Sequence, residues 1–151
     1  MKKSFGFTLI EILVSAVVIV MLTGGGLAAY LDFNNRQILD TTADELKNNL
    51  RQARGWAMAG RKMAGCNGSL IGYQFRFLSG NQYQIRVNCT SSGNTTIRTF
   101  SYDDKVTINS GQSSFIFYAL TGETRIPAFT IVLSLGSRSR TLTVNTNGEI
   151  N

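Results

Sequence analysis

Glu11 is the residue of this sequence whose surroundings most need a chemical explanation. It is a carboxylate at the start of an apolar segment, and from Ile12 to Leu31 no residue carries a charge. Twenty helical residues span about 30 Å, the thickness of the hydrocarbon core of a bilayer. An ionisable group inside a membrane costs roughly 3 kcal/mol and normally has a partner. The sequence therefore predicts a membrane-spanning segment and a cation that pairs with Glu11.

Charges on the two sides of this segment predict its orientation. Lys2 and Lys3 precede it and Asp32 follows it, so the positive-inside rule places the N-terminus in the cytoplasm and the rest of the chain outside. A conventional secretory signal peptide has a similar outline and is the alternative. Glu11 counts against that alternative. So does the sequence after Leu31, where the apolar pattern changes directly into that of an amphipathic helix.

The stretch Gly6-Phe7-Thr8-Leu9-Ile10-Glu11 resembles the prepilin processing motif of type IV pilins and of the pseudopilins of type II secretion. The resemblance implies that a prepilin peptidase cleaves between Gly6 and Phe7 and methylates the new amino group of Phe7. It also implies that Glu11, then the fifth residue of the mature chain, pairs with the Phe7 ammonium of a neighbouring subunit. Two such charges attract strongly in a low-dielectric setting, so the pair would fix the register between subunits.

Length and periodicity predict one modest domain behind the membrane segment. The chain has 151 residues, which leaves no room for a second domain of ordinary size. We expect a leader peptide at 1–6, a transmembrane and filament-core helix at 7–31, and an extracytoplasmic globular domain at 32–151. Apolar residues at alternating spacings of four and three predict that helix continues to about residue 60. These residues are Leu39, Ala43, Leu46, Leu50, Ala53 and Ala57.

From Leu70 onward, β-branched and aromatic residues alternate with polar ones between clusters of Ser, Gly and Asn, a pattern typical of strands. Residues 70–78 and 82–88 predict a hairpin. Because all the turns are short, we expect an antiparallel meander packed on the helix, which is an α+β arrangement of the pilin-like kind. The further predicted strands are 95–102, 105–109, 114–120, 129–135 and 140–146.

A second resemblance covers most of the chain. Leu50-Arg51-Gln52-Ala53-Arg54, Phe115-Ile116-Phe117 and a terminal strand from Thr141 to Val144 are similar to the FimT/GspH class of minor pilins and pseudopilins. The DNA-binding members of that class tend to end on a Gly-Arg-x-Arg pattern. Here the chain reads Gly148-Glu149-Ile150-Asn151, with an acid in place of the first arginine.

Two cysteines, Cys66 and Cys89, lie beyond the membrane segment. In an extracytoplasmic location an isolated pair more often forms a disulfide than a metal or redox site. The predicted hairpin would bring the two residues together at its base. Closing about two dozen residues would stabilise the fold by roughly 3 kcal/mol. The alternative is two buried free thiols, because cysteine packs well as a small apolar residue.

The remaining residues argue against catalysis. The chain has no His, and no base accompanies the serines, so we predict no enzyme activity and no cofactor. Asp103-Asp104 lacks the repeated oxygen ligands of a calcium loop, and we predict no metal. Arg138 and Arg140 are the candidate DNA contacts, since an arginine-bearing loop could bind phosphates in a salt-dependent way. An ordinary solvated hairpin tip is the simpler interpretation.

We therefore predict a structural subunit of a type IV pilus or of a type II secretion pseudopilus. A DNA-binding minor pilin for natural transformation is the alternative. The expected partners are prepilin peptidase, other pilin or pseudopilin subunits, and the assembly platform of the inner membrane. The subunit would first be a single-pass protein of the bacterial inner membrane and would then join the filament.

Overall fold

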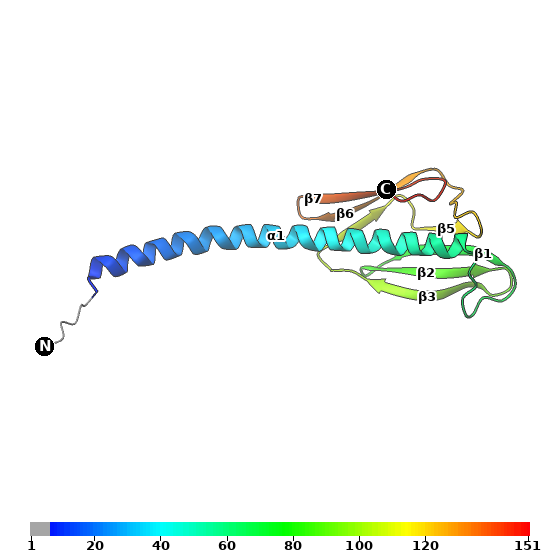
Figure 1. Cartoon of the computed structure of the whole chain (residues 1–151), viewed down its shortest axis with the longest axis horizontal. Coiled ribbons are helices and arrows are strands. Elements are labelled where there is room, and N and C mark those ends of the chain that lie inside the picture. Colours follow the sequence, from blue (N-terminus) through cyan, green and yellow to red (C-terminus); the bar gives the residue numbers. More distant parts are fainter. Residues whose placement is uncertain (1–6) are drawn as a thin grey trace. The chain divides into compact units, whose positions relative to one another are not determined.

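The structure is a computed structural model that describes residues 7–151, and within its helix residues 23–26 and 28 are described by their backbone alone. The predicted leader at 1–6, with Gly6, lies outside the described residues. Two compact units are present, of which the first ends at Gln37 and the second covers Ile38–Asn151. The elements are α1 (Leu9–Met58), β1 (Leu70–Leu78), β2 (Gln82–Cys89), β3 (Gly93–Ser101), β4 (Thr107–Ser110), β5 (Ser114–Tyr118), β6 (Phe129–Leu135) and β7 (Arg138–Val144) (Figure 1).

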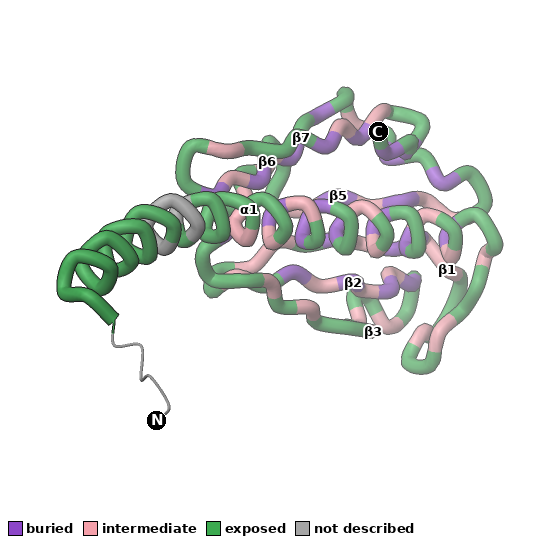
Figure 2. The backbone as a smooth tube through the Cα atoms, turned by 60° about the vertical axis from the view of Figure 1, so that its left-hand side comes forward, coloured by how far each residue is buried: buried purple, intermediate pink, exposed green. Residues whose placement is uncertain are grey.

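The second half of α1 packs on the strands along the stripe that the sequence predicts. All six predicted positions, from Leu39 to Ala57, are buried, and Figure 2 shows the buried positions on this part of the helix among the buried positions of the strands. The helix ends at Met58, close to the predicted end. Gly60 has a φ of 59°, its N–H donates to the Ala57 carbonyl, and the Arg61 N–H donates to the Trp56 carbonyl. This pair of bonds is the Schellman arrangement that ends helices at a glycine.

In the part of the chain that the structure describes, none of the helical stretches combines the length and the apolar character needed to cross a bilayer.

Two antiparallel sheets form, and the predicted single meander is therefore wrong. One sheet has the order β3-β2-β1-β5 and the other the order β4-β6-β7. The chain leaves the first sheet after β3, adds β4 to the second, and returns to place β5 beside β1. The return sets Phe117 opposite Tyr73 and Phe115 opposite Phe75. Cross-strand aromatic pairs of this kind stabilise a sheet, which explains why β5 pairs with β1 instead of with its neighbour in sequence.

The α+β class is confirmed, and so are most of the predicted strands. The β1–β2 hairpin and β6 begin where the pattern predicts, and β1 and β6 also end there. The last strand differs, because β7 begins at Arg138 and not at Arg140. Arg138 therefore belongs to a strand and not to the loop in which the sequence placed it.

A layer of aromatic rings forms the centre of the core. Phe75 stacks on Tyr83 and on Phe115, with ring centroids 5.1 Å and 5.7 Å apart, and Tyr83 stacks in turn on Phe100 at 5.1 Å. Phe75, Tyr83 and Phe115 are buried. The layer thus runs across all four strands of the first sheet and fixes the register in which they support α1.

Gly148 lies in the C-terminal turn, where the backbone comes very close to the backbone at Gly122. It has a φ of 76°, and a Cβ at this position would lie 1.9 Å from the Gly122 carbonyl oxygen. Gly136 has a similar φ of 59° with open space around it. Gly136→Ala should therefore cost only the backbone strain, about 1 kcal/mol, whereas Gly148→Ala should cost roughly 1–3 kcal/mol more because the backbone must also move.

Urea unfolding of the full-length chain, followed through the fluorescence of the single tryptophan, Trp56, would compare the two variants. Equal midpoints for Gly148→Ala and Gly136→Ala would contradict the close approach of Gly148 to Gly122.

Candidate assembly site

The start of α1 carries a hydrogen-bonding pattern that involves Glu11 directly. The Glu11 N–H donates to the Thr8 carbonyl at 3.1 Å and approaches the Thr8 hydroxyl at 3.4 Å. Thr-x-x-Glu is the spacing of a capping box, in which the first side chain accepts a bond from the N–H three residues later. A carboxylate in the first turn also interacts favourably with the helix dipole. Glu11 thus has a local role in starting the helix, which the sequence shows but our sequence analysis missed.

The Glu11 side chain borders an open, largely apolar hollow on the first turns of α1. The hollow has a volume of about 390 Å³ and is lined by Phe7, Glu11, Ile12, Ser15, Ala16 and Ile19. Phe7 is 79% exposed. The Ser15 hydroxyl donates to the Glu11 carbonyl at 2.7 Å, so the hydroxyl is engaged with the helix backbone. A cation that covered this hollow would therefore meet a carboxylate among apolar side chains.

Large apolar side chains are exposed along the part of the first unit whose side chains the structure describes. They include Phe7, Leu9, Ile10, Ile12, Leu13, Val14, Val17, Val18, Ile19, Val20, Met21, Leu22, Leu27, Tyr30, Leu31 and Phe33. Exposed apolar surface of this extent is unusual in a monomer and marks a site for lipid or protein contact. The described part of the first unit thus carries an apolar surface and, in the first turn of α1, the carboxylate of Glu11.

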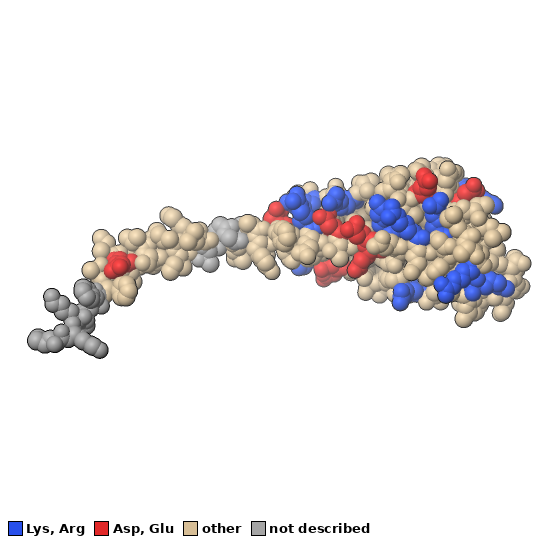
Figure 3. Space-filling model, in the orientation of Figure 1, with Lys and Arg blue, Asp and Glu red and all other residues tan. Residues whose placement is uncertain are grey.

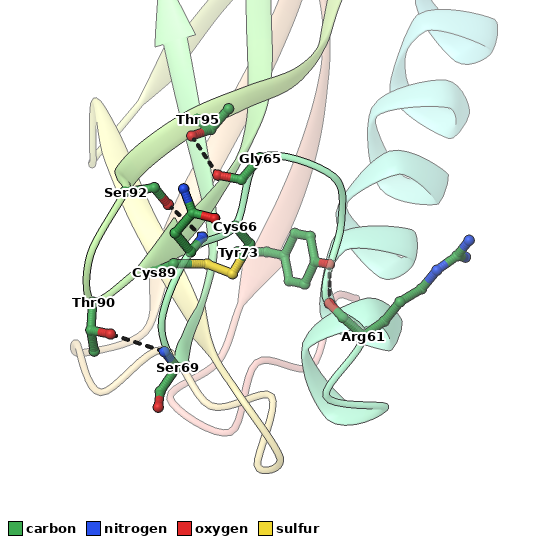
Figure 4. The surroundings of a disulfide bond; sticks show 10 residues. Arg61, Gly65, Cys66, Ser69, Tyr73, Cys89, Thr90, Ser92 and Thr95 are labelled. Atoms are coloured by element: carbon green, nitrogen blue, oxygen red, sulfur yellow. Dashed lines mark hydrogen bonds between the residues drawn. A yellow bond between two sulfur atoms is a disulfide. The ribbon is translucent and has the colours of Figure 1, made fainter.

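The predicted disulfide between Cys66 and Cys89 is confirmed (Figure 4). The Cα atoms of the two residues are 5.6 Å apart, within the usual range for a disulfide. Cys89 ends β2 and is buried, whereas Cys66 lies in the loop between α1 and β1. The disulfide therefore ties the loop that follows the helix to the far end of the hairpin.

Hydrogen bonds hold the same loop beside the disulfide (Figure 4). The Ser69 N–H donates to the Thr90 hydroxyl at 2.9 Å, and the Asn67 N–H donates to the Ser92 hydroxyl at 3.1 Å. On the other side of the loop, the Tyr73 hydroxyl donates to the Arg61 carbonyl, and burial raises the pKa of this hydroxyl. These bonds should keep the loop near its native position even without the disulfide.

Reduction should therefore weaken the fold without abolishing it. We expect dithiothreitol to lower the unfolding free energy of the full-length chain by about 3 kcal/mol, the loop-entropy value for this separation. Differential scanning calorimetry with and without reductant would measure the change. The Cys66→Ala/Cys89→Ala variant is the control, because its stability should not respond to reductant, and an equal response from both proteins would contradict the assignment.

Arg138 and Arg140 do not form a free cationic loop. The Arg140 Nε donates to the Asp40 Oδ1 on α1 at 2.6 Å, and this hydrogen bond raises the pKa of Arg140. Arg138 is also engaged in an interaction within the chain. The charge of Arg140 is thus already compensated by an acid, which makes it a poor phosphate ligand. The predicted DNA contact stays a prediction.

Two arginines on α1 have a role that the sequence analysis did not assign. Arg51 donates to the Ile150 carbonyl at 3.3 Å, and Arg54 donates to the Asn147 carbonyl at 3.2 Å. Residues three apart lie on the same face of a helix, so the spacing of Arg51 and Arg54 indicates that both side chains can bind the same neighbouring segment. The two side chains hold the C-terminal turn against the helix.

Among the described residues, acidic and cysteine side chains do not gather into a group that could hold a metal ion.

Two family models match the chain. The model described as type II transport protein GspH matches residues 42–148, and the model of the prokaryotic N-terminal methylation motif matches residues 1–27. The GspH match covers most of the second unit, and the match to the methylation motif contains Gly6, Phe7 and Glu11. Searches among curated proteins and among solved structures gave no significant match.

Proposed function

The chain belongs to the GspH family of type II transport proteins, within the pilin and pseudopilin superfamily, and from this premise we propose that it is a structural subunit of a type II secretion pseudopilus or a type IV pilus. One observation carries the proposal. The described part of the first unit has large exposed apolar side chains, and the Glu11 carboxylate lies in the first turn of its helix. Lipid covers this surface before assembly, and the helices of neighbouring subunits cover it afterwards.

Processing prepares the helix for assembly. Prepilin peptidase adds water across the Gly6–Phe7 peptide bond, which releases residues 1–6 and leaves an amino group on Phe7. This amino group then attacks the methyl group of a sulfonium donor, so that the donor leaves as a thioether and the nitrogen gives up a proton. Phe7 and Thr8 precede the first residue of α1, so the new amino group lies outside the hydrogen-bonded helix. The amino group can therefore extend away from its own helix and reach the hollow of another subunit.

Glu11 then selects the position of the incoming subunit. The Phe7 ammonium of one subunit pairs with the Glu11 carboxylate of its neighbour, and once the neighbour covers the open hollow, its apolar lining keeps water away from the pair. An unpaired charge in this setting is strongly disfavoured. Relative positions of two subunits that leave the Glu11 carboxylate without an ammonium partner are therefore unstable. DNA binding is not part of the proposal, because Arg140 is already paired with Asp40.

Gly6 tests the processing step. Gly6→Leu places a bulky side chain next to the bond to be cleaved and should leave the precursor uncut in the membrane fraction. N-terminal sequencing and gel mobility would measure this in cells that carry a prepilin peptidase. A mature N-terminus at Phe7 in this variant would contradict the proposed cleavage.

Glu11 tests the assembly step, and Thr8 provides a matched control. Glu11→Gln keeps the size of the side chain but removes its charge, so the subunit should insert and be processed, yet assemble at least tenfold less. Thr8→Val removes the hydroxyl that the Glu11 N–H approaches and keeps the carboxylate, so it should weaken the helix start and leave assembly largely intact. The amount of subunit in sheared filaments, relative to membranes, measures both effects.

Equal losses in the two variants would show that assembly is as sensitive to the helix start as to the Glu11 charge, and would contradict a specific role for that charge. Normal filaments from Glu11→Gln would show that its charge has no part in assembly.

A further inference from the structure

The sequence contains two Asn-Gly steps, and the fold places them in different surroundings. They are Asn67-Gly68, in the loop between α1 and β1, and Asn147-Gly148, in the C-terminal turn. Asparagine followed by glycine readily forms a five-membered imide, because glycine has no side chain to hinder the approach of its nitrogen to the asparagine carboxamide. Each step is therefore a site of chemical change unless the fold restrains it.

Contacts restrain the step at Asn147 and Gly148. The Gly148 N–H donates to the Asn145 carbonyl at 2.8 Å, and Arg54 donates to the Asn147 carbonyl at 3.2 Å. Gly148 is buried, and its backbone lies close to the Gly122 carbonyl. Both the attacking nitrogen and the backbone around it are thus held, so ring closure here requires that hydrogen bonds break first.

The step at Asn67 and Gly68 lacks this restraint at the nitrogen. Asn67, Gly68 and Ser69 are exposed, and among the described residues the Gly68 N–H has no hydrogen-bond acceptor. The hydrogen bonds of this loop fall on either side of the glycine (Figure 4). Before it, the Asn67 N–H donates to the Ser92 hydroxyl, and after it, the bond runs from Ser69 to the Thr90 hydroxyl. The nitrogen that would attack is therefore accessible in the folded chain.

The fold also requires glycine at position 68. Gly68 has a φ of 82°. A Cβ there would overlap the Thr90 hydroxyl oxygen and would lie 2.6 Å from the Ser91 Oγ. Any larger residue would strain the backbone and displace these hydroxyl groups. The residue that best permits imide formation is thus the one that the loop needs.

We propose that Asn67 is a site of spontaneous deamidation in the folded protein, whereas Asn147 is protected. The Gly68 nitrogen gives up its proton and forms a bond to the Asn67 Cγ. The Cγ–Nδ2 bond breaks, and Nδ2 takes up a proton and leaves as ammonia. Water then opens the five-membered imide at one of its two carbonyl groups. One route gives aspartate, and the other gives isoaspartate, in which the main chain continues through the former side chain.

Either product changes the charge next to the disulfide, because a carboxylate replaces the neutral carboxamide. Isoaspartate also lengthens the main chain by one carbon between Cys66 and Ser69. The Asn67 carbonyl, which accepts from the Ser91 N–H at 3.2 Å, then becomes a carboxylate on a branch. Isoaspartate should therefore loosen the loop that the disulfide ties to the hairpin, whereas aspartate should leave the loop in place.

Peptide mapping of the folded, full-length chain in detergent tests the site. After incubation in mildly alkaline buffer, mass spectrometry measures how much of each Asn-Gly peptide has become aspartate or isoaspartate. We expect Asn67 to convert about tenfold faster than Asn147, because ring closure at Asn147 must first break hydrogen bonds. The rate at Asn67 should rise with pH, since the attacking nitrogen must lose its proton.

Unfolding provides a control within the same molecule. In concentrated urea neither step keeps its contacts, and because glycine follows both asparagines, the two should convert at similar rates. A preference for Asn67 that persists in urea would show that the local sequence and not the fold sets it, and would overturn the proposal. Equal rates in the folded chain, faster conversion of Asn147, or no conversion of Asn67 while the urea sample converts would overturn it as well.

Asn67→Gln is the matched variant. Glutamine keeps the carboxamide but would have to close a six-membered ring, which forms far more slowly. The folded variant should therefore show no conversion at position 67 and an unchanged rate at Asn147. Conversion at position 67 at the rate of the parent chain would overturn the proposed attack by the Gly68 nitrogen.

Discussion

Burial of one narrow stripe of α1 is the constraint on which the rest of the structure depends. The stripe from Leu39 to Ala57 is buried in one core with residues of both sheets, and three of its six residues are alanines. Every later feature is tied to this helix. The loop after it is joined to the hairpin by the disulfide, the C-terminal turn is held by Arg51 and Arg54, and the Leu120 loop is bonded to Ala57.

The two parts of the same helix differ in what covers their apolar side chains. The strands of its own chain cover the second part, whereas large apolar side chains of the first part are exposed. Under the proposed function, lipid and then other chains cover that surface, and Glu11 adds a charge that a partner satisfies. A subunit that passes from a membrane into a polymer meets both requirements.

Local patterns predicted the elements well, and pairing between distant segments accounts for the failures. The buried stripe and the β1–β2 hairpin depend on periodicities of a few residues, which the sequence displays directly. The position of β5 does not, because its alternating Phe115 and Phe117 would suit either sheet, and only the aromatic partners on β1 decide between them. The pairing of Arg140 with Asp40 also depends on residues far apart in sequence. The capping box at Thr8 and Glu11 depends on two residues three positions apart, so the sequence displays it directly.

Mass spectrometry of the intact protein, purified from its native membrane or filaments, tests the central claim most directly. The claim predicts a chain that begins at Phe7, carries one methyl group on that residue, and retains the disulfide between Cys66 and Cys89. A chain that still begins at Met1, or one cut after the apolar segment as a secretory signal peptide would be, would contradict it.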